Sequence, residues 1–158
     1  MALDPLIYSK IKDFCISTIE QLIQDRPDVF YPVGTVKVFR QMQRDETNVS
    51  YPCIIVVNTG LFPELMAGDT EKYYWMLPFN ILIQDRESGS LQEQEPRYMG
   101  WHQCLMDRFR QALINDEFNR PFVQADVFPK PIFESNDKRY LEVVGGMALK
   151  FWAIESRS

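Results

Sequence analysis

The chain has a single histidine, His102, which stands close to Cys104 and Asp107, and these three residue types could supply a base, a nucleophile and an orienting acid. Their spacing argues against that use. All three fall in a segment with helical periodicity, where residues two apart point to different faces, so we expect Cys104 to face the core. One histidine with scattered cysteines also lacks the ligand spacing of a metal site. We therefore expect no enzymatic activity, no catalytic residue, no metal and no cofactor.

The remaining polar motifs have structural explanations. Gly145-Gly146 is not a phosphate loop, because it lies within a strand pattern and lacks the lysine and the helix that directly follow such a loop, and it predicts a bulge or bend in that strand. Ser90 and Glu93 match a capping box before a helix. The carboxylates gather in two polar segments and predict solvated surface; they are Glu87, Glu93, Glu95, Asp116 and Glu117.

Composition predicts one domain, 1–158, large enough to bury a core without a disulfide framework. The cysteines, Cys15, Cys53 and Cys104, are odd in number and set among apolar residues, which favours core packing in a reducing compartment. A net charge of −5 argues against a protein that grips a nucleic-acid backbone, although it is compatible with transient passage of DNA. The sequence has no leader pattern and no apolar run long enough for a membrane span, so we expect a soluble protein without a membrane partner.

The strongest pattern lies in 71–86, where every odd position from Tyr73 to Ile83 is apolar. A period of two predicts a strand, and some twelve residues at about 3.3 Å each reach roughly 40 Å, about twice the usual strand length. A second long alternating run follows from Arg139 to Glu155. Pro78 inside the first run must lie at a bulge, a bend or an outward-facing edge, because proline cannot donate to a ladder. Something must cover the excess length of both strands.

The other elements follow from periodicity and breakers. We expect a helix that opens at Asp4-Pro5 and ends near Asp25, and a second helix over about 96–115. Strands are expected over 34–40, over 53–58 as a strand buried on both faces, and briefly over 132–134, followed by a turn at 135–138. The segments 59–70 and 119–131 contain prolines or glycines and predict connections. The fold class is therefore α+β: a mixed or antiparallel sheet with long β-hairpins packed against two helices, in the order α-β-β-β-α-β-β.

This order of elements, together with the motif Trp101, Leu105, Phe109 on the second helix, resembles the tail terminator and head-to-tail joining proteins of tailed bacteriophages. The resemblance implies a virion structural protein of the phage neck, assembled in the host bacterial cytoplasm. Such a protein forms a homo-oligomer, typically a hexameric ring, that caps the tail tube and offers the head-to-tail attachment surface. Its partners would be the tail tube protein and a connector or head-completion protein, with DNA passing through the lumen without specific binding.

Within this resemblance, subunit contacts are expected on the outer halves of the long strands. The expected interface residues are aromatic, the type enriched at binding hot spots: Tyr73, Tyr74, Trp75, Phe151 and Trp152. For Trp75, packing against the first helix of the same subunit is an equally good explanation. Two other functions fit the sequence: another neck, head-completion or baseplate-proximal ring protein, or a non-viral α/β ligand-binding module with a pocket between the helices and the sheet.

Overall fold

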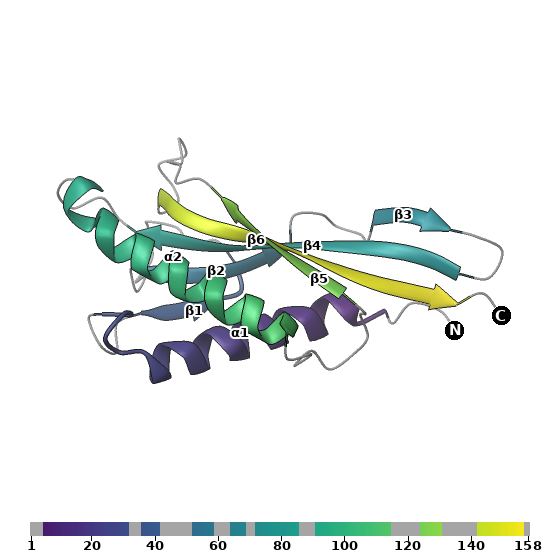
Figure 1. Cartoon of the computed structure of the whole chain (residues 1–158), viewed down its shortest axis with the longest axis horizontal. Helices are drawn as coiled ribbons and strands as arrows, with labels where there is room; N and C mark the ends of the chain where they lie inside the picture. Colours follow the sequence, from purple (N-terminus) through teal and green to yellow (C-terminus); the bar gives the residue numbers. More distant parts are fainter. Residues whose placement is uncertain are drawn as a thin grey trace.

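The computed structural model describes residues 5–31, 36–41, 52–58, 64–68, 72–85, 91–114, 124–130 and 142–156. These residues form two helices, α1 (Ile7–Asp25) and α2 (Leu91–Ile114), and six strands. The strands are β1 (Lys37–Phe39), β2 (Cys53–Asn58), β3 (Glu64–Gly68), β4 (Lys72–Asp85), β5 (Gln124–Lys130) and β6 (Glu142–Ser156). The α+β class with long strands and two helices is confirmed (Figure 1).

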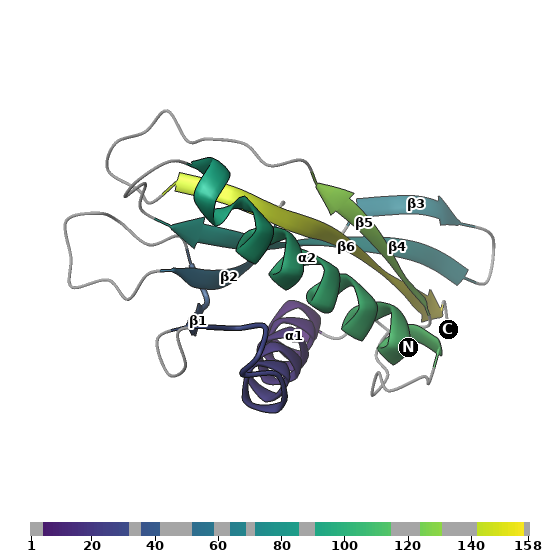
Figure 2. The same cartoon turned by 60° about the vertical axis from the view of Figure 1, so that its left-hand side comes forward.

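The strands form one mixed sheet in the order β1-β2-β4-β6-β5, and β3 pairs with β4 outside this path. Only β1 and β2 run parallel; the other described pairs are antiparallel. The long strands β4 and β6 are separated in the sequence by α2 and β5, so they are not a hairpin, yet they pair along their whole length, from Lys72 opposite Ser156 to Asp85 opposite Glu142. Both helices lie on one side of this sheet, with α2 crossing the long strands and α1 beside it (Figures 1 and 2).

The main core fills the space between the helices and the sheet, and β4 shows why the alternation predicts it. Odd residues of β4 from Leu77 to Ile83 are fully buried in this core, where they meet α1 and α2. The helices contribute their apolar stripes, and the largest buried side chains of α2 are Trp101 and Phe109. In β2, neighbouring residues point to opposite faces, yet both Ile54 and Ile55 have no exposed surface. The prediction of a strand buried on both faces is confirmed.

Two places in the long strands carry residues that disfavour regular pairing, Pro78 in β4 and Gly145-Gly146 in β6. Both lie where the sheet tolerates them. Pro78 falls between the last β3 pair, at Met76, and the first β2 pair, at Phe79, so no described strand needs its missing N–H on that side. The β4–β6 register shifts between Ile83 and Gln84, beside Gly145. The bulge predicted from Gly145-Gly146 is therefore confirmed.

Several sequence predictions were wrong in detail. The segment 59–70 contains a strand, β3, and the segment 119–131 contains another, β5; each pairs with a long strand that supplies the hydrogen bonds. Helix α2 begins at Leu91, so Pro96 lies in its second turn rather than at its start. Helix α1 is preceded by Leu6 in the cap position, without a side-chain cap. The expected roles of Asp4, Ser90 and the hairpin 132–138 lie outside the described residues.

Candidate assembly surface

The long strands continue past the helices. On one side of β4, β2 pairs only from Phe79 onward, and residues 73–76 pair instead with β3. On the other side, β6 pairs with β5 as far as Trp152, and residues 153–156 pair only with β4 among the described strands. The result is a three-stranded extension, made of β3, 72–76 of β4 and 152–156 of β6. Figure 1 shows it reaching beyond the end of α2 along the longest axis of the molecule.

Two of the five predicted interface residues have described side chains in this extension. Tyr73 and Trp75 continue the row of odd β4 residues that is buried beneath the helices from Leu77 onward. Both side chains are half-buried, and their ring centroids lie 6.5 Å apart with the planes tilted by 55°. The same row of side chains therefore changes from fully buried to half-buried where the extension leaves the helices. Aromatic rings with one side accessible are the residue type that binding surfaces favour.

The prediction for Phe151 was wrong. This side chain has no exposed surface and packs in the main core, edge-on to Phe79 with ring centroids 5.7 Å apart. Its strand position explains the error, because Phe151 pairs with Leu77 and so lies under the helices rather than beyond them. Tyr74 and Trp152 pair with Ile154 and Met76 respectively, and their side chains lie outside the described part of the structure.

A buried polar cluster at the opposite end of β4 was not predicted. Asp85, the last residue of β4, accepts a hydrogen bond from the hydroxyl of Tyr98 and pairs with Arg97 at 3.3 Å, both from α2. The side chains of Asp85 and Arg97 are only 9% and 14% exposed. Burial and the hydrogen bond to Asp85 raise the pKa of Tyr98 to about 12. A signal existed in the sequence: a lone acid ends an alternating apolar run, and an Arg-Tyr pair stands on the following helix.

Aromatic rings surround the guanidinium of this cluster. The Cζ atom of Arg97 lies 5.2 to 5.9 Å from the ring centroids of Tyr98, Trp101 and Tyr31, within the range of cation–π attraction. Trp101 in turn donates from Nε1 to the carbonyl oxygen of Val29 at 2.8 Å. The cluster thus ties the end of β4, the helix α2 and the segment after α1 together. Asp85, Arg97 and Tyr98 pair with one another, while Nε of Arg97 is buried without a hydrogen-bond partner among the described residues. Because each of the three carries a contact to another, the cluster has the arrangement of a structural element.

The structure does not assemble a catalytic group from His102, Cys104 and Asp107. The carboxylate of Asp107 accepts a hydrogen bond from Gln103 at 2.8 Å, one helical turn away. Burial raises the pKa of the Cys104 thiol, which disfavours the nucleophilic thiolate. Cys104 is half-buried at the border of the core, so the prediction that it faces the core holds in part. Among the described residues, no group of three His, Cys, Asp or Glu side chains could hold a metal ion.

Two surface grooves border α1. One, of about 500 Å³, separates α1 from α2 and is lined by acids and bases together, among them Asp25, Arg26, Asp107 and Arg108. The other, of about 620 Å³, lies between α1 and β1. The space between the helices and the sheet, where a ligand-binding module would have its pocket, is occupied by the main core.

Within the described part of the chain, neither helix is long and apolar enough to cross a membrane. No model of a known protein family matches the sequence, and no curated protein shows significant similarity to it.

Proposed function

We propose that this chain is a ring-forming structural protein of the phage neck, a tail terminator that caps the tail tube and provides the head-to-tail attachment surface. The observation that carries the proposal is the three-stranded extension. At about 3.3 Å per residue, the 14 residues of β4 span about 46 Å, whereas the 24 residues of α2 span about 36 Å. A sheet that outruns its own helices offers the part beyond them to another surface.

A neighbouring copy is the partner that we propose for the extension. Rings form when one surface of a subunit binds a different surface of the next and the rotation closes. The extension stands at one end of the long axis, so it can reach past its own subunit without disturbing the core (Figure 1). Tyr73 and Trp75 supply half-buried aromatic area on it, and further burial of such rings stabilises an interface.

The acidic composition is compatible with a channel for DNA. A net charge of −5 on each copy sums to a negative ring, and a lumen of the same sign as DNA does not retain the passing strand. The protein has no enzymatic role in this proposal, and its functional residues are those of its interfaces. Another neck ring would use the same extension but bind a different neighbour in the particle.

The experiment is to add the purified chain to tail tubes from the phage whose genome encodes it and to image them by electron microscopy. We expect one ring at one end of each tube. A chain that decorates the tube wall, or leaves tube ends bare at saturating concentration, would contradict the assignment as a terminator. Binding to the isolated connector but not to tubes would favour the other neck-ring function.

A further inference from the structure

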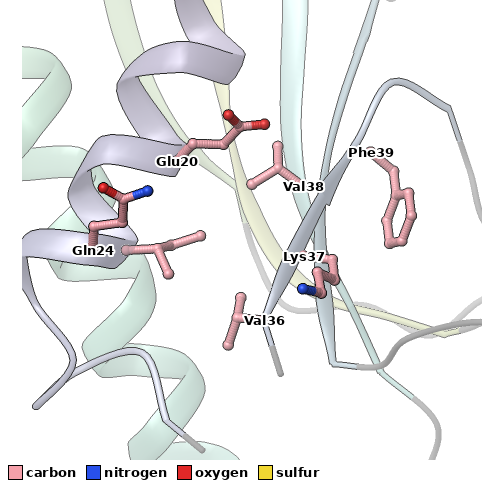
Figure 3. Close-up of a pocket in the computed structure, with 7 residues that line it drawn as sticks. Glu20, Gln24, Val36, Lys37, Val38 and Phe39 are labelled. Atoms are coloured by element: carbon pink, nitrogen blue, oxygen red, sulfur yellow. The ribbon is translucent and has the colours of Figure 1, made fainter. Parts of the chain in front are cut away.

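The groove between α1 and β1 has an unusual lining. Four consecutive residues, 36–39, border it on one side, and Glu20, Ile23 and Gln24 of α1 border it on the other. Neighbouring residues of a strand point to opposite faces, so the lining by four in succession indicates that the groove reaches the backbone of β1 as well as the side chains on one face. Figure 3 shows Val36 and Val38 pointing towards the helix wall with Glu20 and Gln24, while Phe39 points away.

The edge of β1 that borders this groove has no strand beside it in the described part of the chain. The other edge of β1 pairs with β2, and β1 ends the strand order of the sheet. Just after β1, Lys12 donates to the carbonyl oxygen of Arg40 at 2.6 Å, and the Arg40 side chain pairs with Asp13 at 2.6 Å. These contacts hold the residue after β1 against the first half of α1, and the groove lies on the other side of them, between residues 36–39 and the second half of α1.

Two other edge strands differ from this one. The outer strand β5 contains Pro129, which lacks a backbone donor, and β3 carries a register shift between Leu65 and Ala67. Proline and bulges are the devices by which proteins prevent unwanted strand pairing. β1 has neither, and its pairing with β2 is regular over all three residues. Because β1 is short, a segment that pairs with it must also fit against the side of α1 that borders the groove.

We propose that this groove binds an extended segment of a partner protein, which adds to the sheet as a strand beside β1. Main-chain hydrogen bonds to the edge supply affinity in this mode of recognition, and pockets for alternate side chains supply specificity. The volume of about 620 Å³ lies within the roughly 300–1,000 Å³ of ligand sites. The inference is independent of the ring proposed above, because it uses the opposite part of the sheet.

The charges of the groove define the chemistry of the segment. Side chains of an added strand that point to the same face as Val38 meet Ile23 and the exposed carboxylate of Glu20, so they should be apolar or basic. Those on the other face meet the exposed ammonium of Lys37, so they should be acidic or neutral. Self-pairing of two β1 edges would bring two Glu20 carboxylates to one seam, which disfavours a second copy as the occupant.

The test uses a synthetic peptide, acetyl-Glu-Val-Glu-Arg-Glu-Val-Thr-amide, with valine and arginine on one face. We expect saturable one-to-one binding by calorimetry and slower amide exchange in 36–39. E20K should weaken binding roughly fivefold or more, and a peptide with glutamate in place of arginine should restore it. S17K places the same lysine side chain at an exposed position of α1 outside the groove and should leave binding unchanged.

Three results would overturn the proposal. One is the absence of saturable binding at millimolar peptide. Another is equal binding of a peptide in which two adjacent residues, the last glutamate and the last valine, are both replaced by proline, because one of the two lost N–H groups must face the edge. The third is self-association of the chain that E20K abolishes while the peptide does not bind, which would assign the groove to a second copy. Ring formation through the extension is measured separately, so its failure is distinguishable from all three.

Discussion

Arg97 on α2 and Asp85 at the end of β4 form an ion pair of 3.3 Å that is largely buried, whereas Arg26 and Asp28 form a pair of 3.0 Å that is exposed. The two pairs have the same chemistry and differ in environment. Removal of one partner from a buried pair leaves a charge without compensation, while an exposed charge returns to water. The pair at α2 should therefore contribute to stability in a way that the exposed pair does not.

The corresponding prediction compares D85A with D28A. We expect D85A to lower the free energy of unfolding by about 3 kcal/mol, because Arg97 and Tyr98 lose their shared acceptor. D28A should have little effect, since both members of its pair, Arg26 and Asp28, are exposed. Urea denaturation of the two variants measures this, and equal losses would show that the buried cluster does not tie α2 to the sheet.

The raised pKa of Tyr98 predicts that the stability of the fold depends on pH in the alkaline range. Burial and the hydrogen bond to Asp85 raise its pKa from 10.0 to about 12, so the folded chain keeps a proton that the unfolded chain releases. The stability that this residue contributes is complete below pH 10 and is lost as the pH rises from 10 to about 12. We expect the difference in urea midpoint between the wild type and Y98F to shrink over this interval. A constant difference would contradict the assignment.

Replacement of glycine by alanine should have opposite effects on stability at Gly146 and at Gly100. A side chain at Gly146 would overlap the carbonyl oxygen of Ile81 and lie 2.9 Å from Cδ2 of Leu82, whereas one at Gly100 meets nothing within 4 Å. G146A should destabilise the fold by about 3 kcal/mol, because the neighbouring strand must move. G100A should stabilise α2 by about 0.5–1 kcal/mol. Thermal unfolding of both variants checks the β4–β6 register, and a neutral G146A would show it to be wrong.

The three cysteines should react in a defined order. Cys15 and Cys53 have no exposed surface, and burial raises the pKa of Cys53 to about 12 and that of Cys15 further. Cys104 is only half-buried, so a reagent reaches its thiol more easily than the other two. At pH 8, iodoacetamide should modify Cys104 first, as mapped by mass spectrometry. All three should react alike in denaturant, and early labelling of Cys53 in the folded chain would contradict burial of the second face of β2.

Sequence periodicity could predict the central elements because their burial depends on local patterns. The alternation from Tyr73 to Ile83 and the apolar run at 53–58 identify β4 and β2, and the apolar stripes identify both helices. The strands β3 and β5 could not be predicted in this way. Both lie in segments with proline or glycine that resemble connections, and they become strands because β4 and β6 supply hydrogen-bond partners far away in the sequence.

The candidate surface was predictable in outline but not residue by residue. Excess strand length indicates that something extends beyond the body, and Pro78 marks the place where β3 replaces β2 as the neighbour of β4. The alternation alone does not say where the helices end above the sheet. Phe151 was therefore assigned to the surface although its pairing with Leu77 places it in the core.

Trp75 and Phe151 should respond differently to substitution. F151A removes a fully buried ring and should destabilise the subunit by about 3–5 kcal/mol. W75E changes a half-buried ring on the extension and should leave the subunit folded while it prevents association. M99E, which introduces the same charge on an exposed residue of α2, is the matched control and should associate as the wild type does. Circular dichroism and light scattering separate folding from assembly, and an unfolded W75E subunit would place Trp75 in the core.

Sedimentation equilibrium of the wild-type chain, from micromolar to about millimolar concentration, tests ring assembly through the extension. We expect one closed oligomer, with a mass that is a fixed multiple of 18.6 kDa and does not grow further with concentration. The same oligomer should be lost in W75E and retained in M99E. A chain that sediments as a monomer of 18.6 kDa at every concentration would contradict assembly through the extension.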